Sequence, residues 1–192
     1  NSRLGATTTA PVVTAPPTSA GGSFVDQGAS APFGVTSVTS LSGSGIPLRA
    51  YKAYLNAQGM MANEQPSCHV NWSLLAGIGR VESNHGRFGG AGFTADGRVS
   101  PPIYGVALDG SLAGTAVVRD SDNGAYDGDT RWDRAVGPMQ FLPRSWNIHG
   151  GDGNADGQRD PQQIDDAVYG AARYLCSGGG DLGTYQGQYA AV

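Results

Sequence analysis

Residues 68–86 read CHVNWSLLAGIGRVESNHG, and this stretch holds the helix on which the fold prediction rests. Its apolar residues recur at helical spacing on two adjacent sides, with Trp72, Leu75, Ala76 and Gly79 on one and Leu74, Ile78 and Val81 on the next. A helix that is apolar on most faces belongs in the interior of a domain. The sequence therefore predicts a central helix from near Cys68 to near Glu82.

Glu82 stands at the end of this predicted helix, and it is one of only two glutamates in the chain, the other being Glu64. Desolvation and the negative end of the helix dipole both disfavour ionisation there, which predicts a raised pKa. A general acid that works near neutral pH needs such a pKa. The alternative interpretation is a carboxylate paired with Arg80 or with an arginine of a loop.

Two further helices are predicted on either side of the central one. The first runs over 47–57, with Pro47 at its first position, Gly59 just past its end, and Leu48, Tyr51 and Leu55 on one face. The last begins at Asp160 and Pro161 and stops at the glycines 178–180. Its buried stripe is Ile164, Ala167, Val168, Ala171, Ala172 and Leu175.

The remaining segments divide the chain into a linker and one mainly α (α+β) domain. Residues 1–44 carry only two charges and are rich in Thr, Ala, Pro and Ser, which predicts a disordered linker before a domain at 45–192. Residues 86–134 are rich in Gly and Asp, and we expect short strands or ordered turns there. Pro138 and Pro143 can each open a short helical piece.

Composition excludes several classes of protein. The 31 glycines and 11 prolines among 192 residues exclude a long coiled coil or a simple helical bundle. The formal charge is −4, and no cluster of Lys and Arg could follow a phosphate backbone, so no nucleic-acid partner is expected. No apolar run approaches the 18 or so residues that would span a bilayer, so no membrane span is expected in this chain.

Two motifs carry a resemblance to a known family. Residues 81–86, VESNHG, followed by residues 133–146, DRAVGPMQFLPRSW, resemble the catalytic core of the lytic murein transglycosylases, specifically the type B membrane-bound kind and its exported relatives. The similarity covers roughly Ile46 to the end of the chain. It implies a lysozyme-like domain with Glu82 as the single catalytic acid and base, supported by Ser83. Gln140 would bind the sugar from across the groove.

The resemblance also implies the reaction. This family cleaves the β-1,4 bond between N-acetylmuramic acid and N-acetylglucosamine in peptidoglycan, and the muramyl C6 hydroxyl attacks in place of water to give a 1,6-anhydro product. No cofactor is required for this chemistry. A mechanism that uses one acid agrees with the sequence, which has no second carboxylate at the end of an apolar helix. Ordinary glycosidases use two carboxylates. The main alternative is a non-catalytic, calcium-stabilised wall-binding or assembly module. A third interpretation, a hydrolytic muramidase, would need an aspartate from 120–133 to activate water.

Residues 152–160, DGNADGQRD, match the front of a calcium loop. Asp152, Asn154 and Asp156 supply side-chain oxygens at positions 1, 3 and 5, Gly157 allows the turn at position 6, and the carbonyl of Gln158 follows at position 7. Position 12 is Gln163 instead of Glu, and the resemblance places the last carboxylate in the following helix, at Asp166. The alternative is an Asx-rich turn. The acidic stretch 120–129 fits no calcium-loop spacing.

Cys68 and Cys176 are compatible with a disulfide in an exported protein or with two thiols in a cytosolic one. We favour a disulfide, because it would tie the start of the domain to its last helix. Tyr104 and Tyr126 lie in the irregular region and are candidates for sugar contacts, although each could equally be a core residue.

The ends of the chain allow two further expectations. The resemblance implies a protein that is extracellular or associated with the cell wall, tethered through a segment before Asn1. Members of the family continue past this point with a helix that carries a Tyr-Asn pair, and residues 188–192 look like the start of it. The chain is therefore expected to be truncated at its C-terminus.

Overall fold

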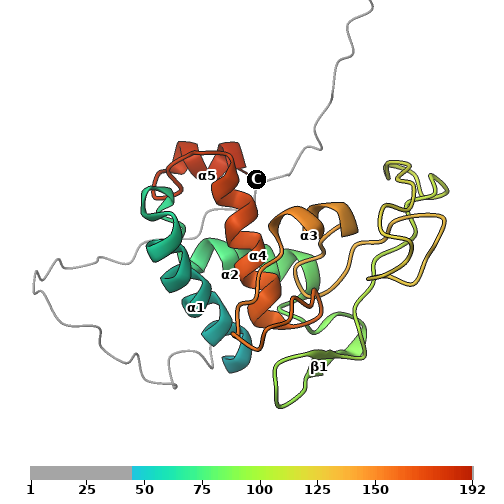
Figure 1. Cartoon of the computed structure of the whole chain (residues 1–192), viewed down its shortest axis with the longest axis horizontal. Helices are drawn as coiled ribbons and strands as arrows, with labels where there is room; N and C mark the ends of the chain where they lie inside the picture. Colours follow the sequence, from blue (N-terminus) through green and yellow to red (C-terminus); the bar gives the residue numbers. More distant parts are fainter. Residues whose placement is uncertain (1–44, 192) are drawn as a thin grey trace, which may run out of the picture. The chain divides into compact units, whose positions relative to one another are not determined.

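The computed structural model describes residues 45–191, so the predicted linker at 1–44 and Val192 lie outside the described residues. The described part is mainly helical with one short two-stranded sheet, which confirms the predicted fold class (Figure 1). Its elements are α1 (Leu48–Glu64), η2 (Pro66–Cys68), α2 (Trp72–Ser83), η3 (Phe88–Gly90), β1 (Gly92–Phe93), β2 (Val99–Ser100), α3 (Pro143–His149), α4 (Ile164–Ser177) and α5 (Tyr185–Ala191). Within this part, no helix has the length and apolar character needed to cross a membrane.

Helix α1 is longer than predicted and buries a different face. It continues through Gly59 to Glu64, because Ala57 and Met61 extend the buried side and outweigh the cost of about 1 kcal/mol for a helical glycine. The predicted face was wrong, since Leu48 and Leu55 are exposed. The buried face consists of Ala50, Ala53, Tyr54, Ala57 and Met61. Its small alanines allow α4 to approach closely, and the two helices lie side by side in Figure 1.

Helix α2 starts later than predicted, at Trp72, because Cys68 belongs to the separate turn η2. The side chain of Asn71 caps the helix by accepting a hydrogen bond from the Leu74 N–H at 2.9 Å. Asn84 ends it in a left-handed conformation, with φ 52°. The prediction of a helix buried on most sides was only partly right, since Val81 is 84% exposed.

Helix α4 also begins later than predicted, at Ile164, and Gln163 caps it in place of Asp160. The delay has a structural cause, because the backbone of Gln163 is extended and bridges Arg98. The side chain of Gln162 bonds both the N–H and the carbonyl of Ile103. These contacts hold the residues after Asp160 against the irregular region instead of in a helix.

The irregular region contains the ordered turns and short strands that were predicted. Strand β1 pairs with β2 in antiparallel register, and isolated bridges join residues 104 to 136, 109 to 117 and 119 to 132. Of the two expected proline-led helical pieces, only Pro143 opens a helix, α3. Pro138 lies in a turn that is closed by the bridge between Val136 and Phe141.

The predicted disulfide joins Cys68 in η2 to Cys176 near the end of α4, with the two Cα atoms 5.5 Å apart. Both cysteines are buried in the main hydrophobic core, together with residues of α1, α2 and α4. The bond therefore fixes the segment before α2 to the last turns of α4.

Candidate active site

A cleft of about 720 Å³ runs along the open face of α2. It is lined by residues of α2, the segment 139–145, α4 and α5, which include Leu74, Gly77, Ile78, Val81, Glu82, Met139, Gln140, Leu142, Ser145, Tyr174 and Gln188. Glu82 is the one carboxylate among the described residues that line it. Most of the wall is apolar, so the cleft places a single acid beside a surface suited to sugar C–H groups.

Glu82 projects from the last turn of α2. Its side chain is exposed, yet partial burial of the carboxyl raises its pKa, as the sequence predicted. It makes no hydrogen bond or ion pair with any residue between 45 and 191. The Arg80 guanidinium instead donates to the Asn84 side chain, so the arginine-paired alternative is not what the structure adopts.

Ser83 connects the two sides of the site from beneath. It is 1% exposed, its hydroxyl donates to the Pro138 carbonyl at 2.6 Å, and the Gly86 N–H donates to that hydroxyl at 2.7 Å. This places Ser83 as a buried support for the helix end that carries Glu82, and it leaves no surface of the hydroxyl for contact with a sugar.

Gln140 lines the same cleft as Glu82, from the turn that follows Pro138. Its backbone is left-handed, with φ 49°, a conformation that costs most side-chain-bearing residues about 1 kcal/mol or more. Its side-chain amide donates to the Gly137 carbonyl at 2.9 Å. Gly137 itself cannot be replaced, because a Cβ there would meet the Pro161 carbonyl. The turn therefore presents Gln140 to the cleft in a defined position.

The two predicted tyrosines do not lie in this cleft. Tyr104 lines a separate hollow, and Tyr126 packs partly against the core while its hydroxyl donates to Asn147 at 3.1 Å. The cleft also has an apolar wall formed by Ile78, Val81 and Tyr174, which the sequence did not predict. Helical periodicity could have found the first two, because a surplus of apolar faces on one helix also indicates a surface that binds a ligand.

A buried pair of side chains supports the end of α2. The Tyr54 hydroxyl lies 3.0 Å from His85 Nδ1, and the two residues are 0% and 3% exposed. Tyr54 also packs against Gly79, where a Cβ would collide with its hydroxyl. Burial, followed by the charges of Arg87 and Arg80, lowers the pKa of His85 from 6.5 to about 4.

This histidine predicts acid sensitivity of the fold. Between pH 6.5 and 4 the unfolded chain binds a proton at residue 85 that the folded chain does not, so the contribution of this residue to stability falls as pH falls, by up to about 3 kcal/mol. The raised pKa of Asp166 acts in the opposite direction, so the test compares the parent with His85→Asn: in urea unfolding across this range, the free energy of unfolding of the parent should fall relative to that of the variant as the pH falls. Tyr54→Phe should keep the parent slope, because burial is the main cause of the shift. Equal slopes for the parent and His85→Asn would contradict the assignment.

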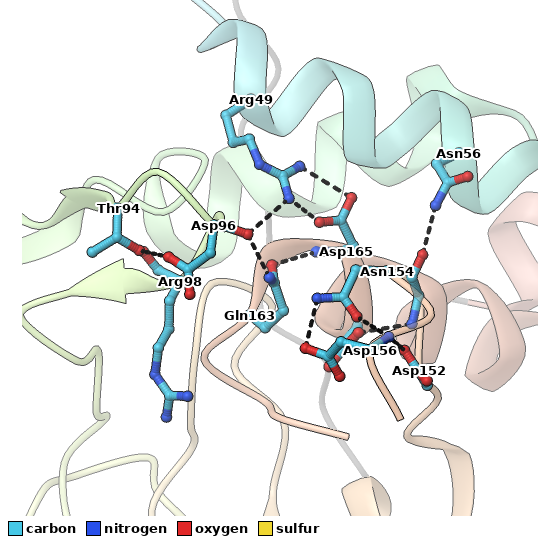
Figure 2. A network of polar contacts seen from close by, with 12 residues as sticks. Arg49, Asn56, Thr94, Asp96, Arg98, Asp152, Asn154, Asp156, Gln163 and Asp165 are labelled. Atoms are coloured by element: carbon cyan, nitrogen blue, oxygen red, sulfur yellow. Dashed lines mark hydrogen bonds and ion pairs between the residues drawn. The ribbon is translucent and has the colours of Figure 1, made fainter. Parts of the chain in front are cut away.

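The predicted calcium loop forms a tight turn between α3 and α4 (Figure 2). Asp152 accepts from the N–H groups of Asp156 and Gly157 at 3.1 and 2.8 Å, and Asn154 contacts Asp156. From α1, the Asn56 side chain donates to the Gly153 carbonyl at 2.7 Å. The loop is thus fixed to the helical core from one side.

Asp166 lies in the first turn of α4 beneath this loop and is fully buried. Its carboxylate accepts from the N–H groups of Gly153 and Asp160 at 2.7 and 2.9 Å. Burial, with repulsion from Asp152 and Asp156, raises its pKa to about 6. The structure therefore directs the predicted distal carboxylate toward the loop.

A second oxygen-rich cluster lies elsewhere. Asp120, Asp122 and Asp133 offer carboxylate oxygens that all lie within 4.8 Å of one another. Among the described residues, the acidic side chains of the 152–166 loop do not form a group as close as this. Ser121 donates to both oxygens of Asp133, through its N–H at 2.9 Å and its hydroxyl at 2.7 Å. The cluster is thus partly satisfied by its own turn.

Comparison with known proteins gives one family and one structure. Residues 116–188 match the family model described as Transglycosylase SLT domain. The chain is similar to SltB3 from Pseudomonas aeruginosa, crystallised in complex with NAG-anhNAM-pentapeptide, with 21% identity and a TM-score of 0.38. That likeness covers 76% of this chain and 41% of the other, so this chain spans less than half the length of SltB3. No curated protein matches the chain.

Over residues 116–188, the family match confirms the predicted resemblance to the lytic transglycosylases. The matched residues include Gln140 and the whole 152–166 loop, whereas Glu82 lies before them. The position of Glu82 in the site therefore rests on its own geometry in the cleft.

Proposed function

We propose that this domain is a lytic transglycosylase that cleaves the β-1,4 bond between N-acetylmuramic acid and N-acetylglucosamine and leaves a 1,6-anhydromuramyl end. The observation that carries the proposal is a cleft of about 720 Å³ that Glu82 and Gln140 both line, in which Glu82 has a raised pKa and is the one carboxylate among the described lining residues. The match to a transglycosylase family over residues 116–188 supports it.

One carboxyl is sufficient for this reaction because its proton is returned. Glu82 first donates its proton to the glycosidic oxygen as the bond to the muramyl C1 breaks. The resulting carboxylate then accepts the proton of the C6 hydroxyl as that oxygen bonds to C1, which restores the acid. Intramolecular attack needs no positioned water. Gln140 would hydrogen-bond the sugar next to the bond that is cleaved.

The competing functions fit the site less well. A hydrolytic muramidase would need a second carboxylate near Glu82, but the aspartates of 120–133 are not among the residues that line the cleft. Asp127 and Asp129 line the separate hollow, where their oxygens accept hydrogen bonds from backbone N–H groups and from the Arg134 guanidinium. A non-catalytic wall-binding module has no need of an unpaired, partly desolvated acid.

Mass spectrometry of peptidoglycan digested by the protein tests the proposed reaction. Transglycosylation predicts anhydromuramyl products that are lighter than the hydrolysed products by one water. Hydrated products alone would establish a muramidase instead. A complete lack of products, with binding to peptidoglycan retained, would favour the wall-binding module.

We also propose a structural calcium ion in the 152–166 loop, held by Asp152, Asn154, Asp156, the carbonyl of Gln158 and Asp166. The residues fit a hard cation, because all of the donors are oxygens and like-charge repulsion contributes to the raised pKa of Asp166. The ion would neutralise these carboxylates and hold the loop against α1 and α4. No step of the sugar chemistry requires it.

Calcium is therefore expected to raise the melting temperature. At a hundred times the dissociation constant, a ligand that binds only the folded state stabilises it by about 2.7 kcal/mol. Thermal melts of the parent with calcium and with excess chelator measure the shift, and Asp156→Ala should abolish it. If the melting curves of the parent with calcium and with chelator were identical, the loop would be only a capped turn without a bound ion. An undiminished shift in Asp156→Ala would move the site, most simply to Asp120, Asp122 and Asp133.

We further propose that the protein acts outside the cytoplasm, at the cell wall. The disulfide between Cys68 and Cys176 supports an oxidising compartment, and the proposed substrate lies there. Fractionation of cells that express the natural gene tests this proposal. Recovery of the protein in the cytoplasmic fraction would contradict it.

A further inference from the structure

Two arginines converge at the end of α2, outside the cleft. The guanidinium groups of Arg80 and Arg87 both donate to the Oδ1 atom of Asn84, at 2.5 and 3.1 Å, so the two cations are held side by side. None of these three residues lines the cleft. Two positive charges that share one neutral amide repel each other, and an anion bound between them would offset that repulsion.

No carboxylate in the described part of the chain forms an ion pair with Arg80 or Arg87. Most of the arginines that are fixed by hydrogen bonds in this part do have an acidic partner, and these are Arg49, Arg98, Arg134 and Arg173. The charge of the Asn84-centred pair is therefore not neutralised by the protein.

Glu82 lies on the same turn as Arg80, but it does not serve as the missing partner. Burial accounts for the raised pKa of Glu82, whereas a guanidinium close to its carboxyl would have lowered that pKa. The two arginine charges act on the interior instead, where they add to the effect of burial and lower the pKa of His85. The positive potential at this helix end is thus separate from the acid in the cleft.

The hydrogen-bond donors of the pair are only partly used. Arg87 is half-buried and is fixed in place, because its Nε and Nη2 donate to the backbone carbonyl and the side chain of Asn84 and to the Gly45 carbonyl. Within residues 45–191, Nη1 of Arg87, Nε and Nη2 of Arg80, and Nδ2 of Asn84 have no acceptor. Planar guanidinium groups with free donors suit the oxygens of a phosphate group.

We propose that Arg80 and Arg87 bind a phosphate dianion, with Asn84 holding the two guanidinium groups together. A phosphate that carries about two negative charges near pH 7 matches two arginine charges, and its three or more free oxygens can accept from both groups at once. A carboxylate has one charge and two oxygens, which a single guanidinium satisfies. The dianion is supplied by free phosphate or by a phosphomonoester on a larger molecule.

NMR titration of the isotopically labelled protein, in calcium-free buffer near pH 7 and at constant ionic strength, tests this site without relying on cleavage. The probes are inorganic phosphate, glycerol 3-phosphate and acetate. The variants are Arg80→Gln and Arg144→Gln. Arg80 is exposed and bonds only Asn84, so its replacement should leave the fold intact. Arg144 is an exposed arginine without a partner among the described residues, so it controls for the lost charge.

Inorganic phosphate should shift the signals of residues around Asn84, and it should bind the parent about threefold to tenfold more tightly than Arg80→Gln, as loss of one exposed charged contact allows. Arg144→Gln should bind phosphate as the parent does. The proposal would be overturned by a lack of saturable shifts around Asn84 in the parent, by equal phosphate affinities of the parent and Arg80→Gln, or by acetate binding as tightly as phosphate.

The two phosphate probes distinguish the sources of the dianion. Glycerol 3-phosphate that binds at least as tightly as inorganic phosphate would identify a phosphomonoester as the ligand, and weaker binding would identify the free ion. Lytic activity is judged separately from the digestion products, so its failure would leave the phosphate result unchanged.

Discussion

Glu82→Gln is expected to abolish cleavage of peptidoglycan while the domain stays folded. Loss of a general acid costs on the order of 10² to 10⁴ in rate, and glutamine has nearly the same shape but no acidic proton to transfer. The fold should be unaffected, because Glu82 is exposed and bonds to no residue in the described part of the chain. Release of soluble fragments and a thermal melt of the same preparation measure the two effects.

The other glutamate provides a matched control. Glu64 bonds Tyr169 and Arg173 away from the cleft, so Glu64→Gln removes the same kind of group and should leave cleavage unchanged. Gln140→Ala should cost less than Glu82→Gln, because it removes positioning hydrogen bonds instead of the proton donor. Retention of more than about a tenth of the parent activity in Glu82→Gln would refute the assignment.

Removal of the disulfide is expected to have the largest effect on stability. The bond between Cys68 and Cys176 closes a loop of 108 residues, and in the chain-entropy model such a loop stabilises the fold by about 4 to 5 kcal/mol. The double variant Cys68→Ser, Cys176→Ser should therefore unfold at a much lower urea concentration than the parent. The parent with a reductant should move to a similar midpoint.

The reductant also supplies the control, since it should not change the midpoint of the double variant. If the oxidised parent and the double variant unfolded at the same concentration, the bond would contribute nothing, and α1, α2 and α4 would hold the domain by packing alone.

The sequence predicts the helices of this domain better than their boundaries or faces. Periodicity locates α1, α2 and α4, but it places Leu48 and Leu55 in the core, where the structure has alanines. The reason is that a close approach between α1 and α4 favours small side chains, which carry little weight in a hydrophobic pattern. The start of α4 was missed because Gln163 pairs with Arg98, a contact between residues far apart in sequence.

In the candidate site, too, the sequence predicts some residues, whereas others depend on contacts that form only in the folded chain. Glu82 and Gln140 follow from motifs, and the structure places both on one cleft. The prediction of Tyr104 and Tyr126 as sugar contacts rests on their place in an irregular region, and composition does not determine the direction in which a loop folds. The hollow beside Tyr104 depends on hydrogen bonds between Asp127, Asp129 and Arg134, which no spacing in the sequence reveals.

The hydrogen bond from Ser83 to Pro138 has a consequence for engineering. It joins two segments that lie 55 residues apart, one ending in the acid and the other carrying Gln140. A cleft grafted onto another helical scaffold would need residues 81–86 and 137–141 to be transplanted together, because neither segment contains both partners of this bond. Libraries that recombine such domains should therefore keep these two segments from the same parent.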